Sequence, residues 1–274
     1  MPQPVYLEKK ILIWAKTYPE LSKKHLETVC TAGVLEDGSP VRLYPIPYRY
    51  TEIEKKFRKY QWITARIARN PNDPRPESYK VDCDSITLGD LVNPTTDEWG
   101  KRAEIVFRHS DWQFQTWDSL MAAQQQNKTS LGCVTPRKII NIEIIPRSAD
   151  EAKSFEEKVE DIRRTIKAQQ AQINLFEESI PADMRHLDFL ESRIRIYWLC
   201  SSETCQGHKM QVLDWELCEL CRREGDEKAK QKLQSICDLS IYATRFFLGN
   251  LFLHPTSFMI VGLWYPKRSD GRLF

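Results

Sequence analysis

Alternating apolar and polar residues mark the first half of the chain as rich in β-strands. An Asp37-Gly38 pair predicts a tight hairpin turn between two of these runs. The Pro-rich stretch 70–78 cannot continue a strand ladder and predicts a loop. Short helices are predicted at residues 51–60, 95–107 and 111–126. The predicted strands are residues 11–18, 26–34, 41–46, 61–70 and 137–146.

A polar segment separates this β-rich part from a second part. Residues 149–186 are rich in Glu, Lys, Arg and Gln with few apolar positions, which predicts a charged helical bridge that ends near Ile180-Pro181. Beyond it, a strand is predicted at 193–200, a helix with a break at Gly225 over 210–242, and closing strands at 245–253 and 257–266. No internal repeat is visible.

These patterns predict an α+β fold in three parts. Residues 1–148 form a β-rich, barrel-like N-terminal module, residues 149–186 the charged helical bridge, and residues 187–274 a C-terminal α+β module. With 274 residues, 41% of them hydrophobic, the chain is long enough to bury one large core or two smaller ones.

Four cysteines and a histidine gather within residues 200–221, in a chain with eight cysteines in total. In a reducing compartment, such a cluster binds metal more often than it forms disulfides. The spacing is Cys-x4-Cys-x2-His, then a longer connection, then Cys-x2-Cys, which allows the chain to wrap a tetrahedral zinc ion. The two helical cysteines have an alternative role as small buried apolar residues. The predicted zinc ligands are Cys200, Cys205, His208, Cys218 and Cys221.

The number of protein ligands decides what such a zinc ion would do. Four ligands make a structural site, which is the favoured interpretation. If only Cys200, Cys205 and His208 bind the ion together with water, a hydrolytic site becomes possible. Asp214 or Glu216 is then the candidate general base. A metal-dependent hydrolase, such as a nuclease, is therefore the alternative function.

Several landmarks follow one another along the chain: TYPELS, ETVCTAG, DGSPVRLYPIPYR, a CxGH motif followed by LDWE, then FFLGN and IVGLWYPK. In this order they resemble a family of uncharacterised bacterial proteins that share them nearly end to end. The resemblance implies the order of the elements and no mechanism. The chain has no Gly-rich phosphate loop, nucleophile elbow or HExxH motif.

The formal net charge is only +2, so any contact with nucleic acid must come from a local patch. Arginines alternate with aromatic residues around the predicted hairpin and the Pro-rich loop, a mixture that suits phosphates and stacked bases. The alternative is that the aromatic residues fill the core and the arginines cover its edges. We predict a nucleic-acid-binding protein of DNA or RNA processing or of defence against mobile DNA. The predicted contacts are Arg42, Tyr44, Arg49, Arg66, Arg69, Arg75, Arg193 and Arg195.

The sequence QINLF at 172–176 resembles the short peptide by which bacterial DNA-processing proteins bind the sliding clamp. It predicts a clamp-like partner held through Gln172, Leu175 and Phe176, and a protein adaptor is thus a further alternative. The competing interpretation is a helix end that docks onto either module. No apolar run approaches the ~20 residues needed to cross a bilayer, and the N-terminus lacks a secretory signal. We therefore expect a cytoplasmic protein without a membrane partner.

Overall fold

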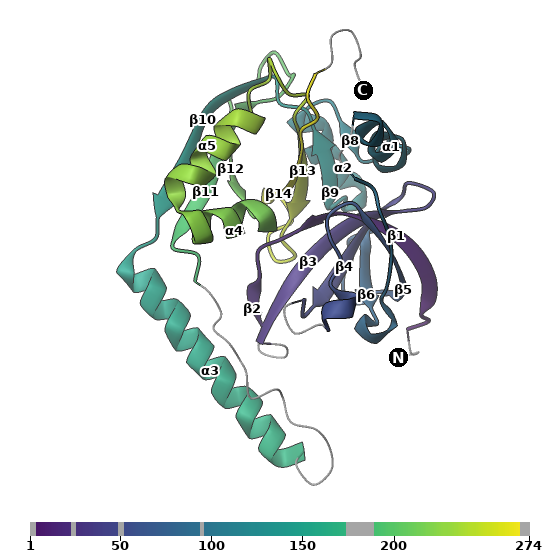
Figure 1. The fold of residues 1–274 in the computed structure, drawn as a ribbon, viewed down its shortest axis with the longest axis vertical. Coiled ribbons are helices and arrows are strands. Elements are labelled where there is room, and N and C mark those ends of the chain that lie inside the picture. Colours follow the sequence, from purple (N-terminus) through teal and green to yellow (C-terminus); the bar gives the residue numbers. More distant parts are fainter. Residues whose placement is uncertain (1–3, 23–25, 49–51, 94–95, 174–188, 269–274) are drawn as a thin grey trace.

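The computed structural model describes residues 4–22, 26–48, 52–93, 96–173 and 189–268. Its strands form two seven-stranded sheets, and helices pack around the second sheet (Figure 1). The predicted α+β fold class is therefore confirmed. No helix within those ranges is long and apolar enough to span a membrane.

The first sheet closes into a barrel, here called barrel 1. In this sheet the strands lie side by side in the order β1-β3-β4-β6-β5. The sheet closes because the C-terminal half of β1 pairs with β3 and its N-terminal half pairs with β5. All pairs are antiparallel except β4 with β6. The short strands β2 (Glu20–Ser22) and β7 (Thr87–Leu91) attach at its edges. The barrel strands are β1 (Leu7–Lys16), β3 (Leu26–Leu35), β4 (Pro40–Ile46), β5 (Gln61–Arg69) and β6 (Ser78–Val81).

The second sheet repeats this strand order and is here called barrel 2. Two consecutive segments, β9 and β10, share the role of the first strand, because β9 pairs with β13 and β10 with β11. The third and fifth strands, β12 and β14, are again parallel. The strands are β8 (Gln113–Phe114), β9 (Leu131–Val134), β10 (Lys138–Pro146), β11 (Ser192–Leu199), β12 (His208–Val212), β13 (Arg245–Asn250) and β14 (Phe258–Trp264).

The helices occupy the connections. Figure 1 shows α3 extending away from both barrels, from the connection between the first and second strands of barrel 2. Between the third and fourth strands, α4 and α5 pack into the core of barrel 2 through Leu217 and Leu233. Two short 3-10 helices, η1 (Ile53–Lys55) and η2 (Cys83–Ser85), lie in barrel 1. The α-helices are α1 (Thr96–Val106), α2 (Trp117–Asn127), α3 (Ala149–Ile173), α4 (Trp215–Glu224) and α5 (Asp226–Ile236).

Several sequence-based boundaries differ from the structure; residues 111–116, for example, were predicted to be helical, but β8 lies there and α2 begins at Trp117. Residues 210–212 were predicted to be helical, but they belong to β12 because Asp214 caps the helix only after them, accepting from the N–H groups of Glu216 and Leu217. The first module was predicted to extend to residue 148, yet β8, β9 and β10 belong to barrel 2. The predicted charged helix is present as α3, and the rest of the predicted bridge, 174–188, lies outside the described residues.

The two barrels share a buried core, which fixes them against each other. Trp14 of β1 packs on Phe247 of β13, with 4.5 Å between ring centroids. Gly262 permits the close approach of β14, because a Cβ atom there would lie 3.0 Å from the Cβ of Ala15. The backbone N–H of Tyr18 also donates to the carbonyl of Leu213 at 2.7 Å. The barrels therefore form one packed unit.

Candidate functional site

The turn between β11 and β12 brings three predicted metal ligands together. The ligand atoms of Cys200, Cys205 and His208 all lie within 4.8 Å of one another. The Cys205 Sγ and His208 Nε2 atoms are 3.2 Å apart. A tetrahedral zinc ion, with bonds of about 2.3 Å to sulfur and about 2.0 Å to nitrogen, holds such atoms roughly 3.5 Å apart. The cluster can therefore hold a metal ion.

The electrostatic surroundings favour the ligand forms of both side chains. Burial lowers the pKa of His208 against the opposing effect of Asp118, so the imidazole is neutral at pH 7. Desolvation raises the pKa of Cys205, but hydrogen bonds from the backbone of Cys200 and Gly207 outweigh it and lower that pKa overall. Neutral imidazole and thiolate are the forms that bind metal.

The structure does not bring Cys218 and Cys221 into this cluster. Both face the core of barrel 2 from α4, where the Cys218 Sγ lies 3.8 Å from the Val212 carbonyl and the Cys221 Sγ lies 3.2 Å from Asp226 Oδ1. Burial raises the pKa of Cys221 to about 12 and that of Cys218 well above its usual value, so both stay thiols. Three of the five predicted ligands thus share one site.

Asp214 and Glu216, the candidate general bases, serve a different purpose in this fold. Asp214 is buried, and its Oδ1 caps α4 while its Oδ2 accepts from Lys59 Nζ at 3.1 Å. Glu216 lies 3.8 Å from the same ammonium group. Among the described residues, neither joins the Cys/His cluster. Both candidate bases thus lie beside the Lys59 ammonium group, and Asp214 also caps α4.

A cavity of about 510 Å³ lies on the outer surface of barrel 1. One wall consists of residues of β3 and β4 whose side chains point away from the barrel interior: Thr28, Cys30, Arg42 and Tyr44. The loop between β5 and β6 forms a second wall with Asn70, Asn72, Asp73 and Arg75. The loop between β13 and β14, from barrel 2, covers the remaining side with Leu251, Phe252, Leu253 and His254. The cavity is thus built by both barrels.

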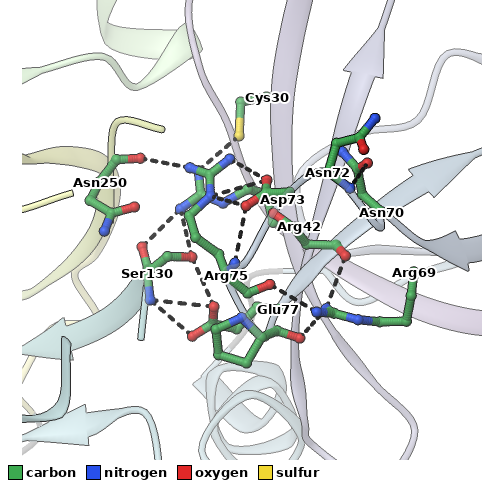
Figure 2. Close-up of polar contacts among 12 residues, drawn as sticks. Cys30, Arg42, Arg69, Asn70, Asn72, Asp73, Arg75, Glu77, Ser130 and Asn250 are labelled. Carbon is green, nitrogen blue, oxygen red and sulfur yellow. Dashed lines mark hydrogen bonds and ion pairs between the residues drawn. The ribbon is translucent and has the colours of Figure 1, made fainter. Parts of the chain in front are cut away.

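Figure 2 shows that two predicted nucleic-acid contacts, Arg42 and Arg75, are structural residues at the junction of the barrels. Arg75 pairs with Asp73 through two nitrogens and donates to the Asn250 carbonyl at 3.2 Å. Arg42 donates to the Ser130 carbonyl at 2.8 Å. Only 4% of Arg42 and 8% of Arg75 is exposed. Neither guanidinium is available to a phosphate.

Two other predicted contacts on barrel 1, Arg66 and Arg69, also bond to groups of the protein. Arg66 pairs with Asp82, and Arg69 donates to carbonyls of its own loop. Tyr44 is 40% exposed and faces the cavity. Arg49 lies outside the described residues. Three aromatic residues that lie near these arginines in the sequence, Trp14, Tyr48 and Tyr60, are buried in the cores.

The corresponding surface of barrel 2 is polar and open. Arg193, Arg195 and Tyr197 point outward from β11, alternating with buried Ile194, Ile196 and Trp198 as the sequence predicted. Arg193 pairs with Glu151 of α3. Across the strands, Arg195 faces Gln211 and Tyr197 faces Lys209. The Lys209 Nζ lies 4.4 Å from the centre of the Tyr197 ring. Sequence analysis missed Tyr197 and Lys209 as site residues, although the alternation placed Tyr197 beside the arginines.

A second cavity, of about 680 Å³, lies beside the first. It lies among β2, α3 and the end of β12, and its lining includes Gln211. It shares four lining residues with the first cavity: Glu20, Leu213, Leu251 and Met259. The two cavities therefore adjoin, and Gln211 places the second one beside β12.

The predicted clamp-binding peptide is only partly described. Gln172 belongs to the last turn of α3. Leu175 and Phe176, the residues that would enter a partner's pocket, lie outside the described residues. The clamp-like partner stays a prediction.

Two family models match the chain. One, "Domain of unknown function (DUF8758)", matches residues 7–108, and the other, "Domain of unknown function (DUF8757)", matches residues 113–274. The predicted similarity to a family without an assigned function is thereby confirmed. No curated protein matches the sequence. The solved structure of a murine DNA-binding protein bound to double-stranded DNA covers 97% of this chain and 99% of that chain, with 10% identity and a TM-score of 0.29. A similarity of this size identifies no shared function.

Proposed function

The chain belongs to the DUF8757 family, and we propose that it binds single-stranded nucleic acid along the outer surfaces of the second and third strands of both barrels. The observation that carries this proposal is that two cavities, one on the outer surface of barrel 1 and one beside β12 of barrel 2, adjoin each other. The strand order of both barrels is that of the OB fold, which binds oligonucleotides or oligosaccharides on that surface, between the loops that join strands 1 to 2 and 4 to 5.

Fold alone does not decide function, so the side chains must support the proposal. Non-specific single-strand binding combines cations that follow the backbone with aromatic rings that stack on bases. On barrel 2, Arg195 and Lys209 provide the cations and Tyr197 the ring, all on neighbouring outward positions of β11 and β12. Glu143 of β10 lies opposite Arg195 and 3.7 Å from Lys209 Nζ, so phosphates would compete with this carboxylate for both cations. On barrel 1, Tyr44 and Phe252 provide partly exposed rings at the cavity. Such a protein suits DNA or RNA processing or defence against mobile DNA.

We further propose zinc as the metal of the Cys200, Cys205 and His208 cluster. Two thiolates and an imidazole match the donor preference of zinc. The cluster lies on the turn that joins the second and third strands of barrel 2. Zinc would link the ends of these two strands, and the residues Arg195 and Lys209 would then be held in a fixed register. The metal would thus have a structural role in the binding surface, with water or a ligand from outside the described residues in the fourth position that the three protein ligands leave open.

The test is the affinity for fluorescein-labelled single-stranded DNA, single-stranded RNA and duplex DNA, measured by fluorescence anisotropy at several salt concentrations. We expect saturable binding to single strands that weakens as salt rises. The double variant Arg195→Ala/Lys209→Ala should bind about tenfold more weakly. It should also have a log-log salt slope smaller by about 1.4, because each lost phosphate contact on a single strand contributes roughly 0.7.

The matched control is the double variant Lys101→Ala/Lys228→Ala, which removes two exposed lysines from α1 and α5 with the same change in net charge. It should keep the affinity and the salt slope of the wild type. The proposal is wrong if no single strand binds at low salt, or if both double variants weaken binding equally, since the effect would then come from net charge alone.

A further inference from the structure

The cavity on barrel 1 has balanced charges. Counting histidine as neutral, its charged lining residues are Glu20 and Asp73 against Arg42 and Arg75. Asp73 pairs directly with Arg75, and the Nη atoms of Arg42 bond to Ser130 and to the Cys30 Sγ. A phosphate group would meet two carboxylates, and the Nη atoms of both guanidinium groups already donate to protein atoms. The lining therefore suits an uncharged polar ligand.

The wall of the cavity nevertheless holds hydrogen-bonding capacity that the protein does not use. Among the described residues, Asn250 Oδ1 and Arg42 Nε are buried atoms without a hydrogen-bond partner. Both residues line the cavity. The Tyr44 hydroxyl accepts from Thr28 Oγ1 at 3.3 Å, which leaves its own proton to donate. Because buried polar groups are nearly always hydrogen-bonded, the presence of two unpaired ones among the lining residues points to a ligand.

Aromatic and apolar side chains surround the mouth of the same cavity. Phe252 is 50% exposed and Leu253 is 79% exposed, both on the loop between β13 and β14. The Arg75 guanidinium carbon lies 5.5 Å from the centre of the Phe252 ring, which holds that ring beside the cavity. Tyr44 of β4 lines the same cavity, so the lining includes two partly exposed aromatic rings on which a planar ligand can stack. A volume of about 510 Å³ lies in the usual range for small-molecule sites.

We propose that this cavity binds a single nucleobase. A nucleobase is planar and uncharged, and it presents both donors and acceptors at its edge, which matches the ring surfaces, charge balance and unused polar atoms described above. The base can come from a free nucleoside or from a strand lying along the barrels, and the second source rests on the function proposed above. In that case the neighbouring cavity, which shares Leu213 and Met259, is the route for the strand.

The test uses Tyr44→Phe, which removes only the hydroxyl group, and Phe252→Ala, which removes a ring surface. Both side chains are partly exposed, so both variants should fold. The matched controls are Tyr6→Phe and Ile140→Ala, at residues that are 39% and 54% exposed and do not line the cavity. Binding of adenosine, guanosine, cytidine and uridine is measured by calorimetry, and binding of labelled single strands by anisotropy. We expect each cavity variant to weaken binding about tenfold and the controls to have no effect.

The two assays separate this inference from the proposed function. Weakened nucleoside binding in the cavity variants supports the base site with free nucleosides as its source, even if no single strand binds. Weakened strand binding without nucleoside binding supports a base delivered by the strand. The inference is overturned if single strands bind equally well to the wild type and both cavity variants while no nucleoside binds, and the proposed function would survive that result. Absence of both kinds of binding would overturn both.

Discussion

Replacing Cys200 with serine should remove the metal ion and lower the melting temperature by about 10–20 °C. A metal that binds only the folded chain adds its binding free energy to folding. A loss of about 5 kcal/mol corresponds to that shift, because each kcal/mol moves the melting temperature of a domain of roughly this size by about 2–4 °C. Cys200 is also the most buried of the three ligands. In Cys200→Ser, water therefore cannot enter to take the place of the lost thiolate ligand. The measurements are the metal-to-protein ratio by mass spectrometry and thermal unfolding by circular dichroism.

Three further serine variants make this result specific. Cys237→Ser changes a similarly buried thiol in the core of barrel 2 and should retain the metal. Cys218→Ser and Cys221→Ser should also retain it, because the structure separates their thiols from the cluster. Metal loss in either α4 variant would restore the five-residue set that the sequence suggested. A wild-type protein that purifies without metal, or full metal content in Cys200→Ser, would contradict the proposed zinc site.

Features that depend on neighbouring residues could be predicted from the sequence. The alternation in β11 correctly separates buried Ile194 from outward-facing Arg195, because side chains of a strand alternate between two surfaces. The hairpin at Asp37-Gly38 is another local feature, and Gly38 has the positive φ of 90° that favours glycine. The cluster of Cys200, Cys205 and His208 belongs to the same class, since one turn contains all three residues.

Features that depend on distant residues could not be predicted. A helix presents several stripes, and the spacing of Cys218 and Cys221 did not reveal that their stripe faces the core of barrel 2. The arginines of barrel 1 resembled a basic surface because their partners are remote, as with Arg42 and Ser130, or Arg75 and Asn250. The repeated barrel was hidden for a similar reason. Pairing order is set by contacts between strands, and the two barrels share that order without a visible repeat in sequence.

The ion pair of Lys59 and Asp214 joins residues that are 155 positions apart, and its disruption should have the second large effect. In Asp214→Asn, the unfolding free energy should fall by about 3–5 kcal/mol, because the ammonium group of Lys59 loses its closest partner in a buried position. Asparagine is also a good N-cap residue, so α4 should still begin at the same residue. The fall in unfolding free energy would therefore come from the lost charge pair. Chemical denaturation at pH 7 measures the effect.

The double variant Lys59→Met/Asp214→Asn should recover at least about 2 kcal/mol of that loss, because no unpaired buried charge is left. Glu216→Gln is the control, since Glu216 is largely exposed and 3.8 Å from Lys59, and it should cost less than about 1 kcal/mol. Metal-dependent nuclease activity is measured on the same proteins. If Asp214→Asn abolished such an activity while its unfolding free energy stayed unchanged, Asp214 would be a catalytic base and the hydrolase alternative would replace the binding function proposed above. Destabilisation without any such activity supports the structural role.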